Sequence, residues 1–581
     1  MSRPWLQAWL SRAACFLRGD RHYAGSRPRH RSRLVVESLE SRWVPSTVTN
    51  LMDSGSGSLR DAIASTPAGD TVDFKPGLSG TIVLYFGELG IVKDLTIAGP
   101  GAGVITVSGN NASRVFRIAA SSAVAISGLT IANGLVSGST VLGGGIDNDG
   151  MLTLADCTLS SNSVNANQII TAGFGGGIAN AGTLIVTNCA LSGNVVSGGN
   201  IVRGGVWGGA IYNRGTLMIT DSTLSGNSAS GSGFYGSAAG GGIGNAGTLI
   251  VTDSTLSGNS AIGTGLGGTG GAISNSGMLT VLSSTLSENH ANTSGGGISG
   301  GQVSVSNTIV AGNTGLSAPD ISGALDSQGH NLIGDGTGGS GYDPTDLVGT
   351  SECPIDPLLG PLEDNGGPTQ TMALLPGSPA LDAGDPDQIG SIDQRGVVRS
   401  GDINIGAYQA SATAFLISAP DTVQSGVPFD VTVTAVDPFG RPAVGYTGTV
   451  TFSTRDTDPN VVLPADYTFA LADGGIHTFT DTGLGETTLI TPGDQTLSVT
   501  DTADGMITGT TLITVDGTAP GAGLHRLGGR SPARSIQGNT PQTGERRHPE
   551  MVAADRWFAS FNEINTGNRF LCKPTAAQEN Y

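Results

Sequence analysis

A segment of roughly 30 residues recurs along the middle of this chain, and a period of that size is typical of folds that stack one structural unit on the next. Each copy opens with Gly-Gly-x-Ile, as in 208–211, and closes on Leu-Ser-Gly-Asn or a variant of it, as in 224–227. The opening isoleucines are Ile146, Ile178, Ile211, Ile243, Ile273 and Ile298. The closing asparagines are Asn162, Asn194, Asn227, Asn259, Asn289 and Asn313.

Apolar residues alternate inside each copy, which places them on one face of a strand. Leu184 and Val186 are one such pair, a second short strand carries Leu191, and the opening isoleucine supplies a third inward side chain. About four buried aliphatic side chains, at ~1.5–3 kcal/mol each, cannot offset the ordering of ~30 backbones at ~1–2 kcal/mol each. The copies must therefore stack. We predict an all-β, parallel β-helix with three short strands per coil, right-handed as parallel crossovers are.

Composition agrees with this prediction and excludes several functions. Glycine accounts for 93 of 581 residues, which disfavours a helical bundle. The formal net charge is −19 while both ends of the chain are Arg-rich, so the middle is strongly acidic and unsuited to nucleic acid. No apolar stretch is long enough for a transmembrane helix.

Inserted residues of variable length separate each closing asparagine from the next Gly-Gly, as in 164–173, 195–206 and 228–239. We expect them to protrude as loops at one corner of every coil. Loops stacked along one side make a variable surface, which is a natural place for recognition.

Polar residues also keep a register from copy to copy. Stacked turn asparagines can hydrogen-bond between coils, so we interpret both asparagine series as structural; the second series is Asn148, Asn180, Asn213, Asn245 and Asn275. Cys157 and Cys189 share one position and would lie ~4.8 Å apart in adjacent coils. Either a disulfide or two buried thiols fits that spacing. The other cysteines are Cys15, Cys353 and Cys572, and no metal-type cysteine spacing occurs.

Three segments resemble known families. The combination of 208–211 and 224–227 resembles the repeats of polymorphic outer membrane proteins, and 57–63 resembles the CSLREA element of secreted β-helix proteins. The long stretch 329–408, with its Asp-Gln-Arg-Gly at 393–396, resembles the choice-of-anchor Q domain of bacterial surface proteins. Together these resemblances imply a secreted, pectin-lyase-like β-helix.

Ser58 and Asp61 also form a capping-box pattern, so we expect a short helix that covers the open end of the coil.

Four regions follow along the chain. We expect a disordered basic leader at 1–46, in which 36–46 resembles an LEPR-type leader motif and for which a plain basic arm is the alternative. The β-helix should occupy 47–410. Strand-period alternation and turn clusters at 411–516 predict an immunoglobulin-like sandwich similar to bacterial spacer modules. The region 517–581 should be a disordered basic tail, or a frame-slipped end.

The repeats contain few side chains that could act in catalysis. Asp221 and Asp253 share one register and should be near neighbours, which leaves a calcium role open. An inverting hydrolase pair is also open, because Asp147, Asp149 and acids of the loops could converge across coils. A lyase needs Lys or Arg as its base. The repeats contain no lysine, and their only permanent cations are Arg203 and Arg214, which disfavours a lyase. We interpret His330 and Asp382 as turn residues.

We therefore assign no catalytic, cofactor-binding or metal-ligating residue from the sequence and expect no cofactor. The predicted function is a non-catalytic secreted or cell-surface protein, an adhesin-like β-helix that presents variable loops at the outer envelope. The alternative is a carbohydrate-active enzyme, either a polysaccharide lyase or a glycoside hydrolase. The expected partners are extracellular glycans or cell-surface proteins, and we expect a monomer. A screen for glycan depolymerisation with and without calcium separates the two hypotheses.

Overall fold

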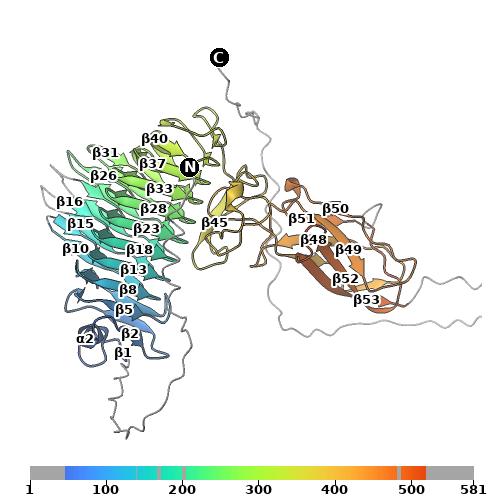
Figure 1. The fold of residues 1–581 in the computed structure, drawn as a ribbon, viewed down its shortest axis with the longest axis horizontal. Helices are drawn as coiled ribbons and strands as arrows, with labels where there is room; N and C mark the ends of the chain where they lie inside the picture. Colours follow the sequence, from blue (N-terminus) through green and yellow to red (C-terminus); the bar gives the residue numbers. More distant parts are fainter. Residues whose placement is uncertain (1–45, 139, 167–171, 199–204, 481–485, 518–581) are drawn as a thin grey trace, which may run out of the picture. The chain divides into compact units, whose positions relative to one another are not determined.

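The computed structural model describes residues 46–138, 140–166, 172–198, 205–480 and 486–517. The predicted leader and tail lie outside these residues, apart from Ser46 and Gly517 at their inner ends. The described part of the chain is built almost wholly from strands, and most of them form a parallel β-solenoid whose coils stack in sequence order (Figure 1).

Each coil contributes one strand to each of three faces, which we name A, B and C. Face A contains β1 (Ser46–Val48), β2 (Thr71–Phe74), β5 (Leu95–Ala98), β8 (Ala123–Ser127), β13 (Met151–Ala155), β18 (Thr183–Thr187), β23 (Thr216–Thr220), β28 (Thr248–Thr252), β33 (Met278–Leu282), β37 (Val303–Ser306) and β40 (Ile321–Ser327). Face B contains β3 (Gly80–Val83), β6 (Ile105–Ser108), β9 (Thr130–Ala132), β14 (Thr158–Ser160), β19 (Ala190–Ser192), β24 (Thr223–Ser225), β29 (Thr255–Ser257), β34 (Thr285–Ser287), β38 (Ile309–Val310), β41 (Leu332–Ile333) and β43 (Leu347–Val348).

Face C carries the Gly-Gly-x-Ile elements. Its strands are β4 (Leu89–Ile91), β7 (Phe116–Ile118), β12 (Ile146–Asn148), β17 (Ile178–Asn180), β22 (Ile211–Asn213), β27 (Ile243–Asn245), β32 (Ile273–Asn275) and β36 (Ile298–Gly300). Faces A and C join into one 20-stranded sheet at β40, which pairs with both β36 and β37 and also with β42 (Gly339–Ser340).

The register of the coils confirms the repeat. Ile178 pairs with Ile211, and Leu184 and Val186 pair with Leu217 and Ile219. All six side chains are fully buried in one continuous core. The prediction that stacked coils bury their aliphatic residues inward is therefore confirmed, whereas the hand of the coil stays a prediction.

The inserted segments differ from the expected loops because most of their described residues form strands. They build a 12-stranded sheet, here called the arm, which runs outward and back again. The outgoing strands are β10 (Leu135–Ser137), β15 (Ser163–Ala166), β20 (Val195–Gly198), β25 (Ser228–Gly231), β30 (Ser260–Gly263), β35 (His290–Ser294) and β39 (Thr314–Ser317). The returning strands are β11 (Thr140–Leu142), β16 (Ala172–Phe174), β21 (Val206–Trp207), β26 (Ser237–Ala239) and β31 (Gly267–Thr269).

A small separate core explains why the inserts are ordered. Val164, Val196, Val206 and Ala229 are fully buried between the outgoing and returning strands. The coil therefore has three strands plus an arm, rather than three strands plus a free loop.

Polar ladders run through the coils as predicted. Asn194 Nδ2 donates to Asn227 Oδ1 at 3.0 Å, and Asn227 Nδ2 donates to Asn259 Oδ1 at 2.9 Å. The ladder ends where Asn313 Nδ2 donates to Asp320 Oδ1 at 2.8 Å, and burial raises the pKa of Asp320 to about 6. Each buried amide is thereby satisfied by the next coil, which is what such groups need away from water.

Cys157 and Cys189 are free, buried thiols, so of the two possibilities the structure has no disulfide between them. The backbone N–H of Cys157 lies 3.4 Å from Cys189 Sγ, and Cys189 N donates to Ser222 Oγ at 3.1 Å. Ser222 in turn is followed by Ser254, whose hydroxyl accepts from Ser222 N at 3.1 Å. The cysteines therefore occupy the first two positions of a ladder that serine continues.

Helix α2 (Leu59–Ser65) covers the first coil, and Figure 1 shows it at the blue end of the solenoid. The backbone N–H of Asp61 donates to Ser58 Oγ at 3.2 Å, as the capping pattern predicts. Leu59 and Ile63 are buried in the solenoid core. The reciprocal half of the box differs, because Asp61 accepts from Gly57 N rather than from the capping residue.

The last coils are followed by a hairpin and two further sheets. The hairpin is β44 (Leu359–Glu363) with β45 (Thr371–Leu374), and a short helix η1 (Pro386–Gln388) follows. A three-stranded sheet contains β46 (Ala414–Ser418), β48 (Val431–Val436) and β51 (Ile476–Phe479). A five-stranded sheet contains β47 (Thr422–Gln424), β53 (Thr508–Asp516), β52 (Gly493–Asp501), β49 (Thr449–Thr454) and β50 (Tyr467–Thr468), with η2 (Leu471–Asp473) before β51.

Candidate binding surface

A glycine turn forms the corner between the arm and face C in the six coils that carry a Gly-Gly-x-Ile element. The first glycine of each Gly-Gly-x-Ile has a φ of between 55° and 70°; these are Gly143, Gly175, Gly208, Gly240, Gly270 and Gly295. At Gly208 an added Cβ would lie 2.1 Å from the carbonyl oxygen of Ile211, so no other residue fits. The motif thus turns the chain sharply and brings the last outward residue of the arm near the outward residue of face C.

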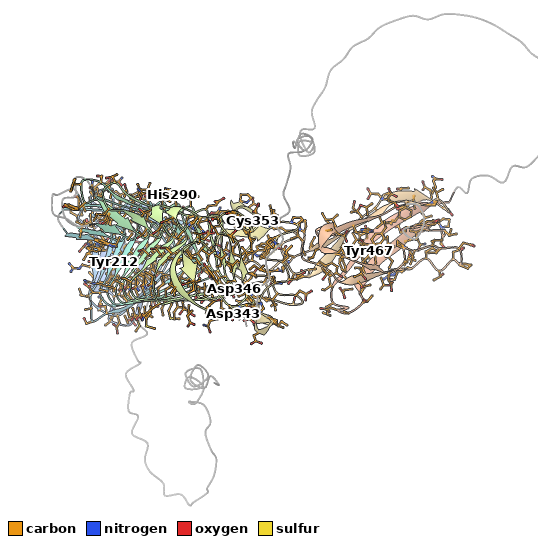
Figure 2. All side chains as sticks on the ribbon, turned by 90° about the horizontal axis from the view of Figure 1, so that it is seen from above. Tyr212, His290, Asp343, Asp346, Cys353 and Tyr467 are labelled. Carbon is orange, nitrogen blue, oxygen red and sulfur yellow. The ribbon has the colours of Figure 1, made fainter. Side chains whose placement is uncertain are left out.

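Three aromatic side chains meet at this corner. Phe174 ends β16 and Trp207 ends β21, and the two are register partners in adjacent coils. Their rings stack with centroids 5.0 Å apart and planes 11° from parallel. Tyr212, on β22 across the glycine turn, lies 4.6 Å from the Phe174 ring. Figure 2 labels Tyr212 on the solenoid.

Small residues follow the aromatic ones in the next coils. Ala239 is the register partner of Trp207, and Gly244 is the register partner of Tyr212. The ring face of Trp207 that points away from Phe174 therefore has no aromatic neighbour among the described residues. Thr269 and Ser274 occupy the same two columns one coil further along and supply hydroxyl groups.

Charged groups lie on the other side of the aromatic cluster. Asp147 and Arg117 are register partners on the outward side of face C, and Arg117 Nε lies 4.0 Å from Asp147 Oδ2. Arg114 lies 3.6 Å from Asp147 and forms a 2.6 Å ion pair with Glu88. Burial raises the pKa of Asp147, and Arg114 opposes that shift.

We name these groups together the corner surface: Arg117, Asp147, Phe174, Trp207 and Tyr212, with the small residues beyond them. Burial raises the pKa of Tyr212, so its hydroxyl is protonated and able to donate at neutral pH. Arg117 and Tyr212 are three coils apart, about 14 Å along the solenoid. The surface is thus a strip with an aromatic platform at its centre and hydrogen-bonding groups at both sides.

The predicted acid pair lies elsewhere and has a structural setting. Asp221 and Asp253 occupy the turn between faces A and B with φ of 51° and 43°, a conformation that Asp and Asn tolerate. Burial and, after it, the Asp253 carboxyl raise the pKa of Asp221, as expected of neighbours. Their shared register is therefore explained by backbone conformation.

The segment from 364 to 410 covers this pair. Arg399, whose side chain is fully buried, donates to Asp253 Oδ1 at 2.8 Å, and Thr369 Oγ1 donates to the carbonyl of Asp221 at 3.0 Å. Burial raises the pKa of Asp221 to about 7 and that of Asp253 to about 6, the latter against the effect of Arg399. Asp221 Oδ1 is buried and has no hydrogen-bond partner.

Other predicted residues also have structural positions. His330 and Asp382 both adopt positive φ in turns, and His330 Nδ1 lies 3.2 Å from the carbonyl oxygen of Ala383, so neither forms a dyad with the other. Asp147 joins the corner surface on face C, away from the Asp221 turn. In the part of the chain that the structure describes, no group of three or more His, Cys, Asp and Glu could hold a metal ion.

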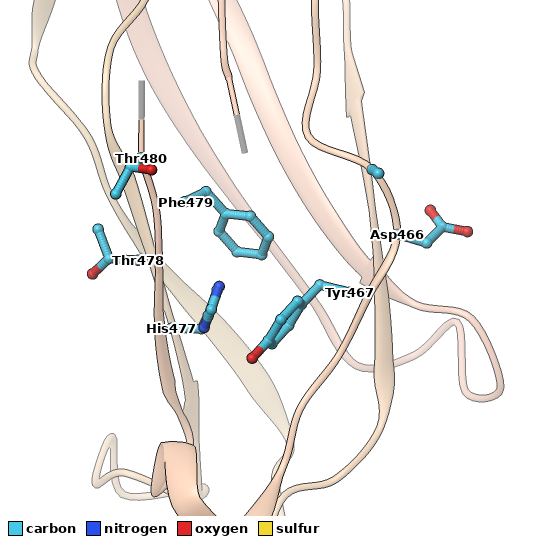
Figure 3. Close-up of a pocket in the computed structure, with 7 residues that line it drawn as sticks. Asp466, Tyr467, His477, Thr478, Phe479 and Thr480 are labelled. Carbon is cyan, nitrogen blue, oxygen red and sulfur yellow. The ribbon is translucent and has the colours of Figure 1, made fainter. Parts of the chain in front are cut away.

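A cavity of about 370 Å³ lies in the region of the two C-terminal sheets (Figure 3). Its rings contact one another: Tyr467 stacks on His477 with centroids 3.7 Å apart, and Phe479 lies edge-on to His477 at 4.7 Å. The Tyr467 hydroxyl donates to Asp473 at 3.0 Å. Because these faces are already engaged with each other, we do not assign a binding role to the cavity.

The sequence did not single out Phe174, Trp207 or Tyr212. A signal was present, since aromatics are only 5% of the chain and Phe174 and Trp207 stand at the same place in successive repeats.

Comparison with family models, curated proteins and solved structures finds no match to this chain. Across the described residues, no helix has the length and apolar character that crossing a membrane requires.

Proposed function

We propose that the chain is a non-catalytic protein, secreted or displayed on a bacterial surface, that binds an extracellular glycan on its corner surface. The observation that carries the proposal is the stacked pair Phe174 and Trp207 with Tyr212 across the glycine turn. An aromatic face accepts the apolar face of a sugar ring, while the Tyr212 hydroxyl and, further along the strip, the exposed Arg117 can hydrogen-bond sugar hydroxyl groups. Most binding sites combine an apolar platform with a few polar groups in this way.

The finer resemblances belong to the same proposal. The segment 329–408 that resembles a choice-of-anchor domain would connect the solenoid to the cell envelope. The strands between 411 and 516 would act as an immunoglobulin-like spacer. The acidic composition and the absence of lysine from the repeats suit a soluble extracellular protein.

The enzyme alternative receives less support from the geometry. A hydrolase needs two carboxyl groups that reach the substrate, whereas Asp253 is paired with the buried Arg399. Asp221 is covered by the same segment. Product release from glycans that is lost in Asp221→Asn would favour the enzyme over the binding protein.

A glycan array probed with the full chain tests the proposal. We expect selective binding that is reduced at least about tenfold in Trp207→Ala and Tyr212→Ala. The matched control is Phe234→Ala, because Phe234 is 79% exposed and packs edge-on to Tyr235 elsewhere on the arm. Binding that is equally reduced in all three variants, or in none, contradicts the proposal.

A further inference from the structure

Face A of the solenoid lacks charged side chains over most of its outward surface. From β5 to β37 every outward position holds Thr, Ser, Ala, Met, Ile or Leu, in a chain whose net charge is −19. The centre of the face is apolar, because Met218 is 41% exposed and Ile185 and Ile250 lie beside it in the same column. Met151 and Met278, which are 52% and 62% exposed, lie in the first column, at the edge of the face.

Part of face B is covered by a later segment of the chain. On face B, the outward Thr223, Thr255 and Thr285 are buried, because Gln394 contacts Thr223 and Thr255 and the backbone of Ala407 donates to Thr285. The arm buries its own inner faces between two layers. Parallel sheets are usually covered on both sides, whereas the outward residues of face A stay half-buried or exposed from β13 to β33.

The size and chemistry of face A suit a second copy of the chain. Eight rungs at ~4.8 Å and five residues at ~3.3 Å, with side-chain width added, give about 700 Å², close to the ~800 Å² per partner of a stable interface. Glycans and polyanions fit less well, because the outward positions offer neither an aromatic platform nor a cation. Two acidic chains repel each other least when they meet across surfaces without charge.

We propose, in place of the monomer expected from the sequence, that face A of one copy packs against face A of another in a two-fold symmetric dimer. Such a contact is self-complementary, with the same patch on both sides, and two sheets can pack about 10 Å apart with their outward side chains interdigitated. Met218 and Ile250 lie at the centre of the contact. Dimerisation would place two corner surfaces in one particle without altering either of them.

Sedimentation velocity of the full chain over a range of concentrations tests this inference. We expect a monomer–dimer equilibrium whose dissociation constant rises at least about tenfold in Met218→Glu and Ile250→Glu, because each buries a charge at the contact. Ser192→Glu, on the outward side of face B, is the matched control and should dimerise like the parent. A monomer at every concentration, or a dimer that neither variant weakens, overturns the proposal.

Methionine oxidation provides a second readout that does not depend on the variants folding. Hydrogen peroxide converts exposed methionine to the sulfoxide. Met218 should be oxidised more slowly as the concentration of the chain rises, whereas Met506, which is 85% exposed, should react at a constant rate. Protection of Met218 in a chain that sediments as a monomer would mean that another part of the same chain covers face A, and would also overturn the proposal.

Discussion

The coils and the arm follow the same path through the repeat but use their residues differently. In the coils one position holds one residue type from copy to copy, as the buried asparagines of the ladder do. In the arm a single outward register holds Leu142, Phe174, Trp207, Ala239, Thr269 and Ser294. Packing and buried hydrogen bonds restrict which residue type fits a buried position of the coils, whereas the outward register of the arm accepts many residue types. The difference indicates that packing constrains the coils, whereas the outward register of the arm can vary, as the proposed recognition role requires.

Removing one asparagine from the ladder should have the largest effect. Asn227→Ala deletes two side-chain bonds that Asn227 donates and two that it accepts from Asn194. With several buried groups left unsatisfied, we expect the free energy of unfolding to fall by about 3–5 kcal/mol, measured by denaturant titration. Asn165→Ala, at an exposed position of the arm, should change it by less than about 0.5 kcal/mol. Equal effects would contradict the distinction between coil and arm.

Valine truncation compares the two cores directly, because Val186 in the coil and Val196 in the arm are both fully buried. We expect Val186→Ala to lower the free energy of unfolding by about 2–3 kcal/mol. Val196→Ala should lower it by about 1 kcal/mol, since the core of the arm is small and half of its buried residues are alanines. Hydrogen exchange should then show faster opening in the arm alone for Val196→Ala, and a loss of protection in the coils would show that the arm is not a separate unit.

The covered acid pair should make stability depend on pH. Burial raises the pKa of Asp221 to about 7 in the folded chain, above the ~3.9 of an unfolded Asp. The folded state therefore binds the extra proton between those values, and stability falls as pH rises from about 4 to 7. Asp221→Asn should remove part of this decline in the melting temperature, with the smallest change near pH 4. The same slope in variant and parent would show that Asp221 does not titrate in this window.

Much of the coil could be predicted because its rules are local and repeat. The aliphatic alternation, the asparagine registers and the helix cap at Ser58 each follow from a short motif. The arm could not be predicted as strands, because its residues are mostly Gly, Ser and Ala and its core forms only when neighbouring coils stack.

The acid pair and the corner surface could be predicted from the sequence to different extents, for a similar reason. Proximity of Asp221 and Asp253 followed from the repeat, but their cover comes from Arg399, 146 residues beyond Asp253, and no local pattern reveals that contact. The corner surface depends on a left-handed glycine at Gly208 together with the register of β16 and β21, so its aromatic residues come together only in the folded chain.

The most direct test uses the fluorescence of Trp207, which is the only tryptophan among the described residues. Titration of the full chain with a glycan identified on the array should change the emission in proportion to binding, because a sugar stacked on the ring excludes water. The account predicts that Trp207→Ala abolishes both the signal and the heat of binding measured by calorimetry, while the melting temperature stays within a few degrees of the parent. Undiminished heat of binding in Trp207→Ala would contradict it.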